Sequence, residues 1–288
     1  MPETNTFTIR PMKLSDLDQA FGLSLNEGWN QTMQDWRLLF DNKENVCLVA
    51  EKDNIVAGTA TALNHDNKIA WIGMVLVDKT LRGQGAGKML LEEIIRRVKH
   101  VESVKLDATP AGEPLYRKLG FIAEYKIFRM TCSALINNSD SKSGNELYPI
   151  TVENLSDILK LDRSVFGTDR SYLLKNLMNE NPDRAFCLKK DNALSGYIFG
   201  RAGSKFNYIG PACAMNQDSA RHLITKAMES LKDKAIAIDI LEDKEDLITW
   251  LETMGFVKQR HFVRMYLNIN PYPGIMKNQY LISGPEFG

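Results

Sequence analysis

Residues 75–88 read VLVDKTLRGQGAGK, and this stretch decides how the rest of the chain is interpreted. Its first three residues end an apolar, β-rich run that starts at Ile69, so they predict the end of a strand. Three glycines follow at positions 83, 85 and 87, and the residues after them have the apolar spacing of an amphipathic helix. A helix that begins directly after a glycine turn presents unpaired N–H groups and a partial positive charge. The stretch therefore predicts a site for a phosphate group.

Two well-known phosphate loops do not fit this stretch. A Walker A loop ending at Lys88 would need Gly at position 82 and Ser or Thr at 89, where the chain has Arg82 and Met89. A Rossmann fingerprint beginning at Gly83 would need Gly or Ala at position 88, which is Lys88. Both are excluded, and a plain strand-to-helix turn remains as the alternative to a phosphate site.

The chain contains an internal repeat. Four short motifs recur in the same order at a nearly constant separation, which indicates duplication of a whole small domain. The matching stretches are 14–17 with 155–158, 52–58 with 190–196, 71–73 with 208–210, and 120–130 with 255–265.

The repeat divides the chain into two similar units. We expect domains at 1–133 and 147–269, a polar linker at 134–146, and an irregular tail at 270–288 that is rich in Pro and Gly. Within the first unit, the hydrophobic periodicity predicts two helices, a hairpin, and then strand, helix, strand, helix and strand. The fold class is therefore α/β with a mixed sheet.

Composition excludes several classes of protein. The 288 residues carry 36 basic and 36 acidic side chains, so no overall positive charge favours nucleic acid. No apolar run reaches the roughly 18 residues of a membrane span, and residues 1–13 lack the apolar core of a secretory signal. The four cysteines are far apart, which argues against disulfides and a metal site. We expect a soluble cytoplasmic protein whose oligomeric state stays open.

The pattern Arg82-x-x-Gly85-x-Gly87 resembles the acetyl-CoA motif of the GCN5-related N-acetyltransferase (GNAT) superfamily. In that family the motif lies between the fourth strand and the third helix. Residues 115–121, LYRKLGF, resemble the family's short helix and its turn into the next strand. The resemblance covers the whole first unit and implies two tandem GNAT-like domains.

The resemblance also implies a cofactor site. Acetyl-CoA would be the cosubstrate, no metal would be needed, and backbone amides of the loop would hold the pyrophosphate. The loop residues are Arg82, Gly83, Gln84, Gly85, Ala86, Gly87 and Lys88. The main chain of Val75, Leu76 and Val77 would accompany the pantetheine arm. Tyr116 matches the position of a catalytic acid near the thioester sulfur, although a Tyr that only packs through its ring is the alternative.

No carboxylate stands in the strand at 71–77, where the family most often has its general base. Glu27 and Asp35 lie in the segment that walls the acceptor site in the family. Glu27 is our candidate catalytic base, and Asp35 with Trp29 our candidate acceptor-binding pair. Each acid could instead bind the acceptor's ammonium group or be an ordinary surface acid. His65 and His100 have no partner at catalytic spacing, so we interpret both as structural.

The second unit departs from the motif, because Ser219, His222 and Ile224 stand where the first unit has Arg82, Gly85 and Gly87. We therefore expect a degenerate copy that keeps the architecture without the cofactor. The predicted function is transfer of an acetyl group to a primary amine of a small molecule or peptide, with no nucleic-acid or membrane partner. The alternative is a catalytically idle module that binds acyl-CoA or regulates another protein.

Overall fold

The computed structural model describes residues 7–134, 146–190 and 192–288, and the predicted linker lies almost entirely outside these ranges. The elements of the first unit are β1 (Thr8–Pro11), α1 (Leu17–Asn26), α2 (Met33–Asp41), β2 (Val46–Lys52), β3 (Ile55–His65), β4 (Ile69–Val77), α3 (Ala86–Arg97), β5 (Ser103–Ala108), α4 (Glu113–Lys118) and β6 (Phe121–Cys132). Those of the second are β7 (Glu146–Pro149), α5 (Val152–Phe166), α6 (Ser171–Glu180), β8 (Phe186–Lys190), β9 (Ala193–Arg201), β10 (Asn207–Ala214), α7 (Gln217–Glu229), β11 (Ile236–Leu241), α8 (Glu245–Thr253) and β12 (Val257–Leu267), followed by β13 (Gln279–Leu281).

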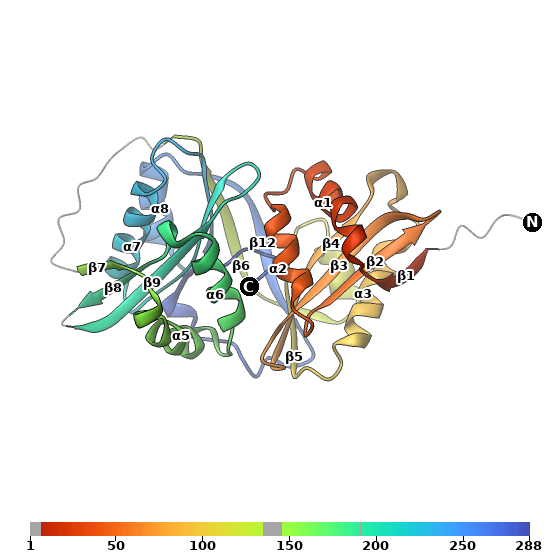
Figure 1. Ribbon diagram of the computed structural model, residues 1–288, viewed down its shortest axis with the longest axis horizontal. Helices are drawn as coiled ribbons and strands as arrows, with labels where there is room; N and C mark the ends of the chain where they lie inside the picture. Colours follow the sequence, from red (N-terminus) through yellow and green to blue (C-terminus); the bar gives the residue numbers. More distant parts are fainter. Residues whose placement is uncertain (1–6, 135–145, 191) are drawn as a thin grey trace, which may run out of the picture.

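All these strands form one mixed sheet, which confirms the predicted fold class. Its order is β1-β2-β3-β4-β5-β12-β6-β11-β13-β10-β9-β8-β7. The last strand of each unit has been exchanged, since β12 pairs with β5 of the first unit and β6 pairs with β11 of the second. Figure 1 shows β6 and β12 side by side where the two halves meet. The spatial halves therefore differ from the sequence units 1–133 and 147–269.

Two buried ion pairs fix this exchange. Arg264 on β12 forms a bidentate pair with Asp107 on β5, with both N–O distances at 2.9 Å. Arg129 on β6 forms the matching pair with Asp239 on β11, at 2.8 and 2.6 Å. The two arginines occupy the same position of the repeat, and each crosses to the other unit. Burial is the largest influence on the pKa of Arg264 and would lower it, but the charges and hydrogen bonds of its neighbours, Asp107 first among them, together raise that pKa, so the guanidinium stays charged.

The tail at 270–288, predicted to be irregular, includes a strand of the sheet. It contains β13, which inserts between β10 and β11, and residues 280–284 and 286–288 are buried. The sequence was misleading because Pro and Gly indicate loops, whereas here the flanking strands supply the hydrogen-bonding edges. Figure 1 places the C mark between the two halves, near α2 and α6.

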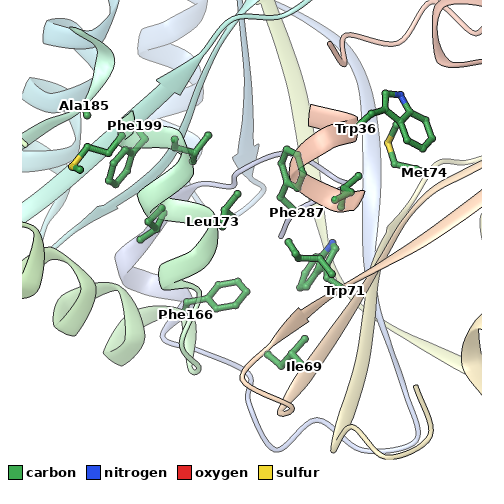
Figure 2. Close-up of a cluster of buried hydrophobic side chains, with 14 of the residues drawn as sticks. Trp36, Ile69, Trp71, Met74, Phe166, Leu173, Ala185, Phe199 and Phe287 are labelled. Carbon is green, nitrogen blue, oxygen red and sulfur yellow. The ribbon is translucent and has the colours of Figure 1, made fainter. Parts of the chain in front are cut away.

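The main hydrophobic cluster draws side chains from both halves. Trp36 and Trp71 of the first half share it with Phe166 and Leu173 of the second, and Phe287 from the end of the chain joins them (Figure 2). Across the three described ranges, no helix combines the length and the apolar character needed to cross a membrane. The four cysteines are free, and the described residues contain no cluster of three or more possible metal ligands.

The exchange predicts a large stability cost when one buried charge loses its partner. Asp107→Ala leaves Arg264 uncompensated inside the sheet, so we expect the free energy of unfolding to fall by about 3–5 kcal/mol. Urea denaturation followed by circular dichroism measures it. Asp157→Ala is the control, because Asp157 pairs with Lys160 at 3.0 Å on the exposed face of α5, and should cost less than about 1 kcal/mol. Equal losses in the two variants would contradict the role given to the buried pair.

Candidate functional site

The glycine loop leaves the first turn of α3 open. Gly83 and Gly85 have φ angles of +79° and +91°, in the left-handed region that favours glycine. A Cβ atom built on either would meet no atom within 4 Å, so the outer surface of the loop is free. Gly85 is the N-cap of α3 and provides no side-chain hydrogen bond. The first N–H groups of α3 therefore point toward an open surface at the positive end of the helix, where an anion is stabilised.

Next to this loop, β4 and β5 separate. Their parallel pairing ends at Ile72 and Leu106, while β4 continues to Val77 and β5 to Ala108. A bulge between β3 and β4 lies at this point, where Met74 has a φ of +50° and its carbonyl accepts a hydrogen bond from Thr59 Oγ1 at 2.7 Å. The opening exposes backbone groups of β4 to any extended molecule that enters it. This is the segment of Val75, Leu76 and Val77 singled out in the sequence.

The charged groups around the loop are partly paired with one another. Arg82 forms an ion pair with Glu27 and also donates from Nε to the Val77 carbonyl at 3.2 Å. Lys79 Nζ lies 3.8 Å from the same Glu27 carboxylate and donates to the Asn26 carbonyl at 2.7 Å. Lys88 pairs with Glu92 on the exposed face of α3. Glu27, at the end of α1, is thus engaged by the two basic residues Lys79 and Arg82.

Tyr116 lies on α4, and its ring packs edge-on against Phe121 at 5.9 Å between centroids. Val75, Val77 and Met89 pack against the same hydrophobic cluster as Tyr116. The Tyr116 hydroxyl has no hydrogen-bond partner among the described residues. Burial raises its pKa above the usual value, so the hydroxyl stays protonated and can donate.

The α1–α2 connection, which carries Trp29, is held by the second half. Asn30 Oδ1 accepts hydrogen bonds from the backbone N–H groups of Lys205 and Phe206, at 3.0 and 2.8 Å. The Trp29 carbonyl accepts another from Ser204 Oγ. Trp29 is half-buried and packs against the cluster shared by both halves. The α1–α2 connection of the first half is therefore held in place by the β9–β10 turn of the second half.

Asp35 is buried and has two structural partners. It caps α2 by accepting from the Thr32 N–H at 2.7 Å, and its other oxygen lies 3.3 Å from Arg201 of β9. Arg201 also pairs with Glu286 at 2.5 Å. An ion pair between the two halves thus occupies the carboxylate that the sequence assigned to acceptor binding.

Sequence reasoning missed the role of residues 282–288, which we call the C-terminal segment. Trp71 Nε1 donates to the Pro285 carbonyl and Tyr208 Oη to the Ile282 carbonyl, both at 3.0 Å. These aromatic residues are equivalent in the repeat, and so are the glycines two positions later. A Cβ on Gly73 would lie 2.8 Å from Glu286 Cα, and one on Gly210 would collide with the Ile282 carbonyl. The repeated aromatic-Ile-Gly motif was visible in the sequence, but nothing local identified what it contacts.

His65 also contacts the C-terminal segment. Its Nε2 lies 3.2 Å from the Phe287 carbonyl, which requires that Nε2 carry the hydrogen. Complete burial, reinforced by the charge of Arg170, lowers the pKa of His65 to about 3. The ring is therefore neutral at physiological pH and acts as a structural hydrogen-bond donor.

Comparison with known proteins identifies the family of both units. Residues 14–121 match the acetyltransferase (GNAT) family, and residues 158–281 match an acetyltransferase (GNAT) domain. The chain is 25% identical to a holothin acyltransferase of Pseudoalteromonas over 94% of this chain and 91% of that protein.

Solved structures share the fold over nearly the whole chain. A Pyrococcus horikoshii protein assigned as an acetyltransferase superposes with a TM-score of 0.81 at 20% identity, covering 100% of this chain and 98% of that one. A tandem GNAT protein from the clavulanic acid biosynthesis pathway gives 0.65 at 13% identity, covering 91% and 98%. The chain therefore belongs to the GNAT acetyltransferases, carries two GNAT domains in tandem, and is an acyltransferase.

Proposed function

We propose that the first half binds acetyl-CoA and transfers its acetyl group to a primary amine. The observation that carries the proposal is the open glycine loop at the start of α3, directly beside the opening between β4 and β5. A pyrophosphate would meet the backbone amides of residues 82–88, and a pantetheine arm would run along residues 75–77. The free outer face of Gly83 and Gly85 leaves room for that approach.

The second half supports this assignment by contrast. Its equivalent strands, β10 and β11, also pair only as far as Ile209 and Ile238, which match Ile72 and Leu106 in the repeat. Beyond that point β13 fills the opening and pairs with both strands. Helix α7 is capped by the Asn216 side chain, which accepts from the Ser219 N–H at 2.9 Å. One opening thus contains an extended strand of the chain itself, and the other is available to a ligand.

In the transfer step, we assign proton donation to Tyr116. Acetyl-CoA supplies an acyl group on a thiol leaving group. The Tyr116 hydroxyl stays protonated and has no described partner to compete for it, so it can donate to the sulfur as negative charge develops there. Glu27 and Asp35 are each engaged by an arginine. We assign them to shaping the acceptor wall with Trp29, with Glu27 also orienting Arg82.

The proposed acceptor is an amine of a small molecule or a peptide. Testing a defined panel of amines as substrates would identify which kind the protein uses. The panel contains benzylamine, spermidine, 4-methoxyaniline, a dipeptide with a free N-terminus, and holothin. Holothin is included because the Pseudoalteromonas relative is named as its acyltransferase. The assay measures thiol release from acetyl-CoA together with mass spectrometry of the acetylated amine. Binding of acetyl-CoA without turnover on any amine would favour an idle module.

The glycine loop predicts the effect of one substitution on binding. Gly87→Val adds a side chain near Val77 Cγ2, at an ordinary contact distance of 3.5 Å, so the fold should tolerate it. The same side chain would lie where the phosphate meets the helix, and we expect CoA affinity to fall at least about tenfold, because displaced charge-assisted hydrogen bonds contribute roughly 1.5–3 kcal/mol each. Calorimetry measures the change. Gly22→Val is the control, because Gly22 also lies in a helix and has open space around it. If the two variants bound CoA with identical affinity, the proposed phosphate site would be ruled out.

The filled opening of the second half predicts the stoichiometry. We expect one CoA per chain, bound in the first half, because β13 and the Asn216 cap occupy the equivalent places in the second. Calorimetric titration of the full chain gives the number of sites. A value of two, or a remaining site in Gly87→Val with wild-type affinity, would show that the second half binds CoA as well.

Tyr116→Phe tests the proposed acid. The change removes only the hydroxyl and retains the ring packing against Phe121. A positioned acid typically contributes about 10²–10⁴-fold, and we expect the low end because a thiol titrates near pKa ~8.5 and leaves readily. Steady-state kinetics should show reduced kcat with nearly unchanged CoA affinity. Turnover at the wild-type rate, with chemistry limiting, would make Tyr116 a packing residue.

A further inference from the structure

The structure brings an acidic residue, Glu286, against the strand in which the sequence has none. Ile72 and Leu106 form the last pair of β4 and β5, and Gly73 is the next residue of β4 into the opening. Glu286 packs directly on Gly73, because a Cβ there would lie 2.8 Å from Glu286 Cα and 3.2 Å from its Cβ. The backbone of a residue more than two hundred positions away in the sequence therefore lies against β4 at the residue where the opening begins.

The Glu286 carboxylate is held on one side and free on the other. Its Oε1 atom pairs with Arg201 at 2.5 Å, which orients the group. Its Oε2 atom is buried and has no hydrogen-bond partner among the described residues. A buried acceptor without a partner costs about 1–3 kcal/mol, so a donor that enters the site, such as an ammonium group or a water bound to it, would be stabilised there.

Several charged groups surround this carboxylate. Burial is the largest influence on the pKa of Glu286 and raises it. The negative charge of Asp35 also raises this pKa, whereas the positive charges of Arg201 and Arg129 lower it, and the net result is a raised pKa. The Glu286 charge in turn acts on Arg129 of β6, Arg201 of β9, Arg260 of β12 and Tyr208 of β10. A carboxyl group with a raised pKa accepts a proton from an ammonium group more readily than an ordinary glutamate does.

We propose that Glu286 is the general base that removes the proton from the acceptor ammonium in the first half. This role rests on the acetyl transfer proposed above. When the acceptor ammonium group is converted to the product amide, its nitrogen loses two protons. The first proton goes to the Glu286 carboxylate and from there to solvent. The nitrogen lone pair forms a bond to the thioester carbonyl carbon, the C–S bond breaks, and sulfur leaves with the electron pair. Tyr116 gives its proton to that sulfur and regains the second proton from the nitrogen.

Glu286→Gln tests the role with little structural change. The amide oxygen can still accept a hydrogen bond from Arg201, and the raised pKa shows that the site disfavours the charge which the substitution removes. Glu242→Gln is the control, because Glu242 also links the halves by accepting from the Lys126 N–H at 2.8 Å, but it is only half-buried and follows the end of β11. Thermal unfolding of each variant and CoA calorimetry verify that fold and cosubstrate binding persist.

The readout is kcat/KM as a function of pH, with the fastest amine of the panel. For an alkyl amine at neutral pH we expect Glu286→Gln to lose at least about 100-fold. The activity of Glu286→Gln should return at high pH, where the amine is already neutral. Glu286→Asp keeps a carboxylate, so at neutral pH it should be more active than Glu286→Gln. For 4-methoxyaniline, which is neutral at pH 7, the loss should be much smaller.

Three contrary outcomes are distinguishable. An active wild type with an unchanged pH profile in Glu286→Gln would leave acetyl transfer intact and make Glu286 only the buried counterion of Arg201. A wild type that binds acetyl-CoA but acetylates no amine of the panel would overturn the proposed function and this role with it. Equal losses in Glu286→Gln and Glu242→Gln would also contradict the proposal, because they would reflect contact between the halves.

Discussion

Two buried arginines join the sequence units of this chain. Arg129 and Arg264 occupy the same position of the repeat, and each finds its aspartate on the penultimate strand of the other unit. A charge buried inside a sheet is tolerable only when it is paired and hydrogen-bonded. In the observed arrangement each arginine meets this need across the boundary between the sequence units, and the exchange of β6 and β12 joins two domains into one continuous sheet.

Because the sheet is continuous, the two halves have a fixed relative position. Side chains from both halves form one hydrophobic cluster between them. The C-terminal segment runs from Gly210 of one half to Gly73 of the other. At both positions the absence of a side chain lets the segment pack directly on the strand. Trp71 and Tyr208, which are equivalent in the repeat, each bind a carbonyl of that segment. The second half thus contributes to the candidate site through Arg201, the β9–β10 turn and the support of Glu286, although its own loop has lost the glycines.

Sequence analysis succeeded where the determinants are local. The glycine loop, the helix after it and the mixed α/β fold follow from backbone freedom and hydrophobic periodicity within a few turns of chain. The partners of Glu27 and Asp35 did not follow, because Arg82 and Arg201 reach them across long separations. The exchange of β6 and β12 was equally hidden, since either unit would show the same local pattern if it kept its own last strand. The ordered tail was missed because its strand depends on edges that β10 and β11 provide.

The duplicated opening explains why one copy could change its loop without losing the fold. In both halves the parallel strands separate after equivalent residues, Ile72 with Leu106 and Ile209 with Ile238, and the exposed strand edges need hydrogen-bond partners. In the second half β13 satisfies them permanently, so a glycine loop for a ligand is no longer required, and the Asn216 side chain caps the helix instead. The same piece of chain then continues as residues 282–288 to the first half, where the opening stays free. The strand that fills one opening therefore also brings Glu286 against Gly73 of the other half.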